Sequence, residues 1–297
     1  MGKVLSAWSY FAEKGFFNWM SDESYLKKMY KYRTGKNLNL DYPKSFNEKL
    51  QWLKIHNKRD EYSNFVDKYE VKRILKDIIG EKHIIPTLGV WDKYEEIDYS
   101  LLPRQFVLKS THDSGSVVIC KDKDQFNEKK AREIIEKSLT YNFYWHGREW
   151  PYKNVKPRII AEKYMQDSKD EDLKDYKVFV FNGEPFCVQV DYDRFTDHHR
   201  NFYTTEWEYM PFTTCYPTNP KHIVDRPEKL NLILDLSRKI SKYLDSIPFV
   251  RVDFYVIDNE VYFGEVTFYH GNGFERFFPD EYDILLGNKI ILGGEDV

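Results

Sequence analysis

The sequence predicts an α+β fold, in which a mainly helical region up to about residue 100 precedes a chain rich in strands. Apolar residues at helical spacing, such as Leu26, Met29 and Tyr30, dominate the first region. From Phe106 onward, segments alternate apolar and polar residues, which is the period-two pattern of strands. The change in period is what separates the two regions.

Composition bounds the class of protein. The chain has 297 residues, of which 41% are hydrophobic, so it can bury a substantial core. It contains no run of about 18 apolar residues, and charged residues interrupt its first 19 positions, so we expect no membrane span, no secretory signal and a cytoplasmic location. The net charge is −3 with acidic and basic residues interleaved, which argues against a nucleic-acid partner.

Two further features of the composition are less decisive. The three cysteines share no CxxC spacing, which argues against a disulfide framework or a zinc site and favours buried, unreactive thiols. Aromatic residues make up 17% of the chain, which fits either a sugar-binding surface or core packing.

The helical region has recognisable ends. Ser45 followed by Glu48 is a capping-box pattern and predicts a helix over 47–56. A second helical pattern opens at Asp67-Lys68 and ends near Gly80. Residues 84–90 then predict a short strand interrupted by a proline.

The next segment predicts a strand, a polar loop and a second strand over 106–120. The loop contains Ser114, Gly115 and Ser116, small residues that can direct several backbone N–H groups at one anion. Lys109 at the root of the loop supplies positive charge. The GxxxxGK[ST] pattern of a P-loop is absent, and an ordinary hairpin loop with a surface lysine explains this segment alone equally well.

The rest of the chain alternates between predicted helices and strands. Helices are predicted over 126–139, 230–244 and 281–292, and strands over 158–165, 176–181 and 186–190. An aromatic connection that contains Trp150 joins the first of these helices to the first strand. Arg194, His199 and Arg200 lie in a polar segment that, with Trp150, could bind an anionic sugar, although a surface loop is as good an interpretation.

The most informative stretch is a hairpin near the C-terminus, with strands over 249–257 and 261–267. If residues 258–260 form the turn, Asp253 lies opposite Glu265, and Phe263, Glu265 and Thr267 share one face. Two facing carboxylates repel, so we expect a cation between them. Mg²⁺ suits the pair because it commonly takes one or two carboxylates and completes its shell with water and phosphates. Arg251, one pleat away, would reach the same phosphates.

In order along the chain, these pieces resemble the ATP-grasp superfamily. The resemblance rests on Asp67-Lys68, Lys109 with its loop, Glu162 to Met165, Asp175 to Val178, and Arg251-Val252-Asp253 with Glu265. The segments PKSFNEKLQWLK, REWPYKN and RVDFY with GEVTFYHG resemble more narrowly the TupA-like branch, named for teichuronopeptide biosynthesis. The resemblance implies an ATP-grasp fold, in which the lobes 101–168 and 169–297 enclose a nucleotide after a helical region, 1–100.

The resemblance also implies roles for individual residues. ATP would be held by Lys68, Lys109, the loop of Ser114, Gly115 and Ser116, the hinge of Glu162, Lys163, Tyr164 and Met165, and Lys177. Mg²⁺ would be held by Asp253 and Glu265, with Thr267 where the superfamily usually has Asn. Arg251 and Lys109 would stabilise the transferred phosphoryl group, together with Arg194 or Arg200.

The predicted function is that of an ATP-dependent carboxylate–amine ligase of bacterial surface-polysaccharide biosynthesis. It would join an amino acid or peptide amine to a uronic acid or similar carboxylate through an acyl phosphate. A glycosyltransferase is the alternative, although Asp191-Tyr192-Asp193 is the only imitation of its DxD metal motif. A non-catalytic ATP-binding module is the third possibility.

Overall fold

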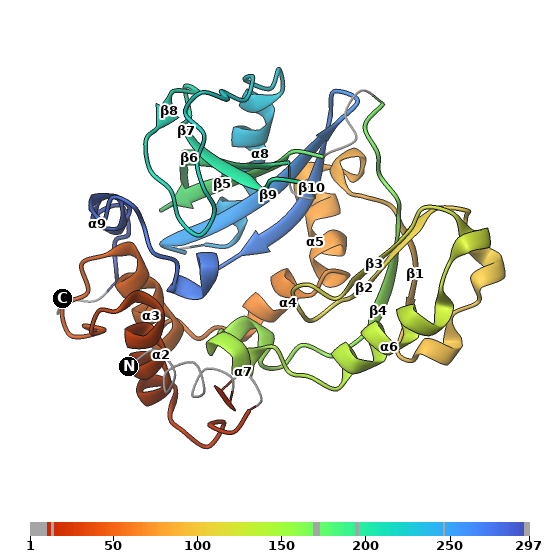
Figure 1. Ribbon diagram of the computed structural model, residues 1–297, viewed down its shortest axis with the longest axis horizontal. Coiled ribbons are helices and arrows are strands. Elements are labelled where there is room, and N and C mark those ends of the chain that lie inside the picture. The colour runs from red at the N-terminus through yellow and green to blue at the C-terminus, as the bar shows by residue number, and fades with distance from the viewer. Residues whose placement is uncertain (1–10, 13–14, 169–172, 194–195, 246, 294–297) are drawn as a thin grey trace.

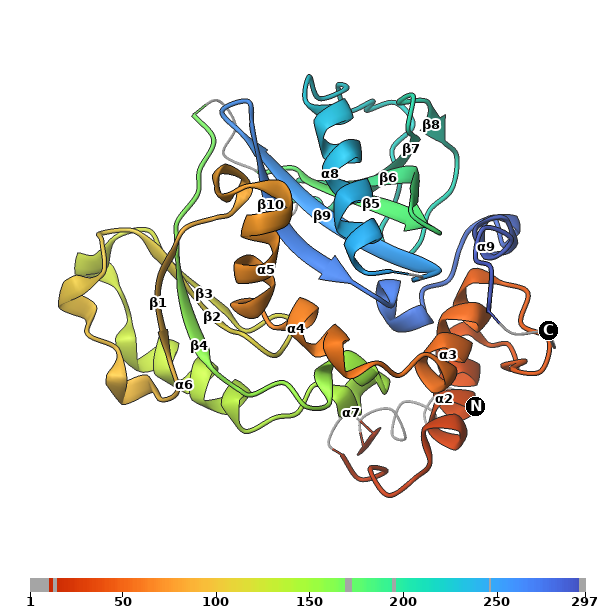
Figure 2. The same cartoon turned by 180° about the vertical axis from the view of Figure 1, so that it is seen from behind.

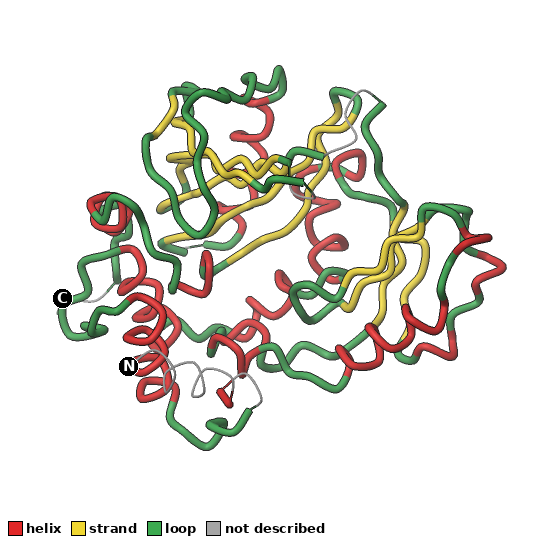
Figure 3. The backbone as a smooth tube through the Cα atoms, in the orientation of Figure 1, coloured by secondary structure: helices red, strands yellow, loops and turns green. Residues whose placement is uncertain are grey.

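The computed structural model describes residues 11–12, 15–168, 173–193, 196–245 and 247–293 (Figure 1). In this part of the chain, two antiparallel sheets lie apart from each other, with helices between and around them (Figure 3). The strand order is β1-β4-β2-β3 in the smaller sheet and β10-β9-β5-β6-β7-β8 in the larger one. The predicted α+β class, with a helical region first, is confirmed.

The N-terminal region is helical up to His83. Its elements are α2 (Asp22–Thr34), α3 (Phe46–His56), η1 (Asp60–Tyr62), α4 (Ser63–Val66), α5 (Glu70–Ile79) and η2 (Glu81–His83). The capping box predicted at Ser45 is present, because Ser45 accepts from the Glu48 N–H while the Glu48 side chain accepts from the Ser45 N–H. The Asp67 carboxylate accepts from two backbone N–H groups and so fixes the start of α5.

The smaller sheet and its helices form one lobe. Its elements are β1 (Thr87–Trp91), η3 (Tyr94–Glu96), η4 (Tyr99–Leu101), β2 (Phe106–Ser110), β3 (Val117–Cys120), η5 (Lys123–Gln125), α6 (Glu128–Leu139), α7 (Tyr144–Gly147), η6 (Trp150–Tyr152) and β4 (Ile159–Lys163). One face of the sheet packs on α6 through Leu108, Ala131 and Ile135. Because β1 starts after Pro86 and pairs with β4, the smaller sheet begins before residue 101.

The larger sheet forms the second lobe. Its elements are β5 (Asp175–Phe181), β6 (Glu184–Tyr192), β7 (His199–Thr204), β8 (Tyr209–Met210), α8 (Leu230–Tyr243), β9 (Phe249–Ile257), β10 (Glu260–Thr267), η7 (His270–Gly273) and α9 (Glu281–Gly287). Helix α8 covers one face of the sheet and packs on α5, as seen from behind in Figure 2. Helix α9 ends at Gly287, five residues earlier than predicted, and Asn288 is its C-cap.

The β9–β10 hairpin has the predicted pairing at its functional end, but it reaches that pairing differently. Its turn has two residues, Asp258 and Asn259, both at positive φ, rather than the three predicted. A bulge at Gly264 then shifts the register by one, so that Asp253 does pair with Glu265. Because of the bulge, Phe263 lies on the buried face, opposite to Glu265, so the prediction that they share a face was wrong.

Aromatic side chains fill the main core, which extends from the N-terminal helices into the larger sheet. Phe46 of α3 contacts the rings of Phe179, Phe181 and Phe249. This packing fixes the N-terminal region against the sheet that carries the hairpin. Core packing therefore accounts for much of the aromatic content.

Candidate active site

Three lysines gather at the smaller sheet. Lys109 on β2 donates to Glu162 Oε2 on β4 at 2.5 Å, and Lys72 on α5 pairs with Glu162 Oε1. Burial disfavours the ionised Glu162 carboxyl, but the two lysines outweigh burial and lower its pKa to about 2. Each oxygen of the Glu162 carboxylate is thus paired with one lysine. Glu162 orients Lys109 in this structure, and its predicted part in holding ATP stays a prediction.

Lys68 joins this group from the turn before α5. Its Nζ donates to the Asp113 carbonyl, and its backbone N–H donates to Thr111 O at 3.0 Å. Both contacts are with the loop between β2 and β3. We call Lys68, Lys72 and Lys109, together with Glu162, the lysine cluster. The side chains of Lys68 and Lys109 remain 24% and 25% exposed, so both can reach a bound anion.

The predicted phosphate loop and hinge flank the lysine cluster. Ser114, Gly115 and Ser116 form the tip of the loop, and Gly115 has φ of 103°, a conformation that favours glycine. Lys163 ends β4, and Tyr164 and Met165 follow as the chain crosses to the larger sheet. No side-chain contact in the described residues gives these positions another role, and ATP binding there remains a prediction.

A second group of charges lies on the larger sheet. Asp253 on β9 accepts from Arg251 Nε at 2.7 Å and from Lys177 Nζ on β5 at 2.9 Å. Lys177 also pairs with Asp175 and lies 4.0 Å from Asp191 on β6. Burial would raise the pKa of the Asp253 carboxyl, but Arg251 and Lys177 lower it below its usual value.

These contacts continue into a closed ring. Arg200 on β7 bonds Asp191 Oδ1 at 2.7 Å and Glu275 Oε2 at 3.1 Å. Glu275 meets His270 at 3.2 Å, and His270 Nδ1 lies 2.9 Å from Arg251, which returns the ring to Asp253. We call this set the acidic network; its members are Asp175, Asp191, Asp253, Glu275, Lys177, Arg200, Arg251 and His270.

Glu265 lies beside the acidic network without belonging to it. It pairs with Asp253 across the hairpin, and no hydrogen bond or ion pair reaches its carboxylate from the described residues. Thr267 pairs with Arg251 and accepts a hydrogen bond from that side chain at 3.0 Å. Its hydroxyl is therefore already engaged with a cation.

The carboxylates of Asp253 and Glu265 suit Mg²⁺ when phosphates and water complete its coordination shell. No three His, Cys, Asp or Glu side chains gather closely enough to hold a metal ion alone, as far as the structure is described. Two opposed carboxylates, Asp253 and Glu265, are what Mg²⁺ takes when phosphates and water supply the other ligands. The unpartnered Glu265 carboxylate supports this fit, whereas Thr267 contributes little.

Lys68 connects the two groups. Burial lowers the pKa of its ammonium group, and the charges of Glu265 and Asp113 raise it, while Lys109 and Glu162 act on it from the smaller sheet. The ammonium group of Lys68 therefore interacts electrostatically with Glu265 on one sheet and with Lys109 on the other. This coupling is what the prediction of one shared nucleotide site requires.

Other predicted residues lie elsewhere or have different surroundings. Arg194 falls outside the described residues. Arg200 lies on a strand, β7, rather than in a surface loop, and its charge is matched by two carboxylates. Trp150 contacts the ammonium groups of Lys58 and Lys153, and a sugar site that combines it with Arg200 stays a prediction. The prediction of buried thiols was wrong for Cys215, which is exposed.

The comparison with protein families now decides the assignment. A model of the TupA-like ATP-grasp family matches residues 48–291. The chain belongs to the TupA-like ATP-grasp family. This family is a branch of the ATP-grasp superfamily, whose members are ATP-dependent ligases. None of the curated proteins matches the chain.

Solved structures similar to this TupA-like protein are ATP-grasp enzymes. D-alanine–D-alanine ligase from Bacillus anthracis, complexed with ATP, is 19% identical with a TM-score of 0.40, covering 68% of this chain and 53% of the ligase. An ADP complex of N5-carboxyaminoimidazole ribonucleotide synthetase is 14% identical with a TM-score of 0.45, covering 74% and 50%. D-alanine–D-alanine ligase from Helicobacter pylori is 16% identical with a TM-score of 0.40, covering 84% and 70%. The chain thus spans about half the length of the first two.

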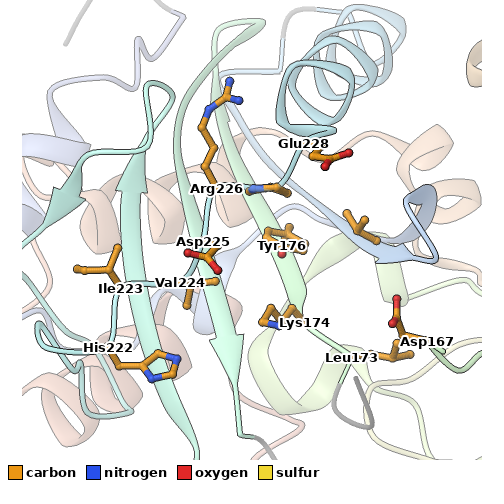
Figure 4. Close-up of a pocket in the computed structure, with 12 residues that line it drawn as sticks. Asp167, Leu173, Lys174, Tyr176, His222, Ile223, Val224, Asp225, Arg226 and Glu228 are labelled. Carbon is orange, nitrogen blue, oxygen red and sulfur yellow. The ribbon is translucent and has the colours of Figure 1, made fainter. Parts of the chain in front are cut away.

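Two pockets on this TupA-like protein lie away from the charged groups. One, of about 530 Å³, is lined by Tyr176, Val256 and residues 222–228 (Figure 4). Tyr176 and Val256 alternate along β5 and β9 with Lys177 and Asp253, so this pocket opens on the other face of the sheet. The other, of about 680 Å³, includes Lys163 and Tyr164. Neither contains Lys109 or Glu265.

Two residues of the site were not predicted from the sequence. Lys72 follows Lys68 by four residues, and a helix opening at Asp67-Lys68, as predicted, would place both lysines on one face, although α5 begins only at Glu70. That spacing was a usable signal. Glu275 carries no comparable signal, because its cationic partner Arg200 lies 75 residues away in the sequence.

No helix of the described chain is both long and apolar enough to cross a membrane.

Proposed function

We propose that this protein is an ATP-dependent carboxylate–amine ligase of bacterial surface-polysaccharide biosynthesis. It joins the amine of an amino acid or peptide to a uronic acid or similar carboxylate, and ADP and phosphate are released. The observation that carries the proposal is the pair of Asp253 and Glu265 facing each other, with Arg251 beside them and Lys68 under the influence of both sheets. Family membership supports the use of ATP.

The residues divide the work of phosphoryl transfer. Lys68 and Lys109 bind the phosphates, and Glu162 orients Lys109 for this contact. Arg251 is held by Asp253 with its guanidinium directed along the hairpin, where it offsets charge as the phosphoryl group moves to the carboxylate substrate. Mg²⁺ bound by Asp253 and Glu265 would neutralise phosphate charge.

The surroundings of Asp191 favour the ligase over the glycosyltransferase. A glycosyltransferase would use Asp191 and Asp193 as metal ligands. Asp191 is 2% exposed and bonded by Arg200, which together with Lys177 lowers the pKa of this buried carboxyl to about 2. Unlike Asp253, which faces the unpartnered Glu265, Asp191 lies between Asp175, which is paired with Lys177, and Arg200, so no free carboxylate faces it.

A nucleotide-consumption assay tests the proposal. The purified protein is incubated with MgATP, a panel of uronic acids including glucuronate, and a panel of amino acids, and ADP, AMP and nucleoside diphosphates are measured separately. We expect ADP and phosphate to appear only when a carboxylate is present, and hydroxylamine to trap the acyl phosphate as a hydroxamate. Release of UDP from a UDP-sugar without ATP would instead identify a glycosyltransferase.

A further inference from the structure

A buried acidic residue lies beside the proposed phosphoryl-transfer site but has no part in the roles described so far. Glu149 precedes η6 and is 5% exposed. In the described part of the chain, its carboxylate has neither a hydrogen-bond donor nor a cation within bonding distance. The charges that act on it are Lys54, Glu265 and Arg251, which places it near the β9–β10 hairpin.

A second unsatisfied acceptor lies next to Glu149. Asn272, in the loop after β10, has a buried side-chain oxygen to which no described residue donates a hydrogen bond. A Cβ atom built on Gly147 would lie 2.0 Å from Asn272 Oδ1 and 3.2 Å from Glu149 Oε1, so the two oxygens are neighbours. Buried acceptors normally have donors. These two therefore suit a ligand that carries several N–H donors and a positive charge.

The protein holds this pair of acceptors rigidly. Arg148 points the other way from the same segment: its guanidinium is buried, donates to Phe17 O at 2.9 Å, and lies 4.4 Å from the ring centre of Tyr25. Lys54 on α3 donates to Gly147 O at 2.7 Å and Asn272 O at 2.8 Å, and so joins the segment to the loop after β10. Figures 1 and 2 show α7 close to that loop. Such fixed groups suit substrate recognition.

We propose that Glu149 and Asn272 Oδ1 bind the amino group of the second substrate and direct it at the acyl phosphate. This inference rests on the proposed ligase function and gives that function a site for the amine. The charges of Glu265 and Arg251, which the proposed function assigns to metal and phosphate, act on the Glu149 carboxylate, and Lys54 holds the adjacent backbone with hydrogen bonds.

Glu149 can accept the proton that the substrate ammonium group must lose before its nitrogen attacks. Burial raises the pKa of the Glu149 carboxyl to about 7, Lys54 opposes the shift and Glu265 adds to it, so the group can accept a proton near neutral pH. The ammonium group gives one proton to the Glu149 carboxylate and becomes a neutral amine. Its lone pair forms the C–N bond as the C–O bond to phosphate breaks, and the second proton leaves with the phosphate.

The test separates amine use from acyl-phosphate formation. Wild type, Glu149→Gln and Asn272→Gly are incubated with MgATP and glucuronate, with hydroxylamine or with alanine as the nucleophile. Hydroxylamine is largely uncharged at neutral pH and reports the first half-reaction, whereas alanine presents an ammonium group. Glycine suits position 272 because its φ is 56°. We expect the ratio of amide to hydroxamate to fall about 100-fold in Glu149→Gln, through KM for alanine, and about tenfold in Asn272→Gly.

Each other outcome has a distinct meaning. Equal loss of both products in a folded Glu149→Gln protein would overturn the amine site and assign Glu149 to phosphoryl transfer or to structure. Wild-type ratios in both variants would also overturn it. Failure of wild type to form any hydroxamate with the uronic acids would refute the ligase itself, and the amine site with it. Glu81→Gln, an exposed acid-to-amide change outside the site, should leave both products unchanged.

Discussion

The lysine cluster and the acidic network are both buried groups of paired charges, yet they are built in opposite ways. In the lysine cluster, Lys72 and Lys109 share Glu162 while Lys68 contacts Asp113, and two of the three lysines remain partly exposed. In the acidic network, four carboxylates contact two arginines, one lysine and one histidine, and nearly every charge is already matched. Burial lowers the pKa of that histidine, His270, and so favours its neutral form. Glu265 adds a further negative charge beside it.

This difference indicates what each group can bind. The lysine cluster has an excess of positive charge, with two lysine side chains free enough to reach phosphates. The side of the hairpin that carries Glu265 has an excess of negative charge, which suits a cation. A metal–triphosphate complex matches both, because its phosphates are anionic and its metal is cationic. Asp253 and Arg251, at the hairpin, are the members of the acidic network placed to contact this ligand, and the other matched charges support them.

The sharpest test of that contrast is the removal of Arg200, a cation in the middle of the acidic network. Arg200→Ala leaves Asp191 and Glu275 buried with fewer partners, so we expect the free energy of unfolding to fall by about 3–5 kcal/mol. Denaturant unfolding measures this. Arg104→Ala is the matched control, because Arg104 also pairs with two carboxylates but is 70% exposed, and it should cost less than about 1 kcal/mol. Wild-type stability with lost acceptor use would instead make Arg200 a substrate contact.

The second prediction concerns the acid that lies outside the network. Glu265→Gln keeps the shape of the side chain and relieves its repulsion with Asp253, so the melting temperature without metal should hold or rise. Turnover should fall about 10²–10³-fold, because charge stabilisation in the transition state is lost. Thermal melts and ATP turnover are measured on the same samples. Glu260→Gln, exposed on the same strand, is the control. Near-normal turnover would remove the magnesium assignment.

The third prediction concerns the partly exposed face of the lysine cluster. Lys109→Ala removes a charge that binds phosphate, whose hydrogen bonds are worth about 1.5–3 kcal/mol, so KM for ATP should rise roughly 10–100-fold. Lys72 remains on Glu162 and keeps that carboxylate paired, so the variant should stay folded. Lys129→Ala, exposed on α6, should not change KM. An unchanged KM in Lys109→Ala would mean that this lysine serves Glu162 alone.

Local pattern was enough to predict most of the lysine cluster and the hairpin, but not the acidic network. Lys109 and Glu162 lie on strands that the period-two pattern identifies, and the facing of Asp253 and Glu265 follows from turn and register. The turn was nevertheless predicted one residue too long, and the bulge at Gly264 cancelled that error. A glycine inside a strand is itself a signal for a bulge.

The acidic network depends on contacts that no local pattern contains. Arg200 meets Glu275, which is 75 residues away, and Lys177 meets Asp253, which is 76 residues away. Strand β7 was missed because its polar residues resemble those of a surface loop, although pairing with β6 buries Arg200. Glu149 likewise has no sequence signal, since its neighbours come from α3 and from the loop after β10.

The smallest expected effect is in acid, and it separates the two groups by their response to pH. Glu162 has a pKa of about 2 in the folded protein against an ordinary value of 4.5, because Lys109 and Lys72 outweigh burial. Its stabilising contribution is therefore complete above about pH 4.5 and is lost as pH falls toward 2, where the folded carboxyl takes up its proton. In Glu162→Gln this one proton no longer contributes, so the slope of unfolding free energy against pH should decrease by at most about 1.4 kcal/mol per pH unit between these limits.

The decisive comparison is with Arg200→Ala, which acts on the other group. Asp191 also titrates at about 2 in the folded protein, because Arg200 and Lys177 outweigh its burial. Loss of Arg200 should raise that pKa toward 3.8 and flatten the slope over a narrower window, between pH 2 and 3.8. Urea unfolding at several pH values measures both variants.

The double variant tests whether the two groups are electrostatically independent. If they are, its slope of unfolding free energy against pH should decrease by the sum of the two single decreases, because the two carboxylates share no partner. A double variant no flatter than Glu162→Gln alone would show that the lysine cluster and the acidic network titrate as one unit, and the division of roles between phosphate binding and support of the metal-binding hairpin would then fail.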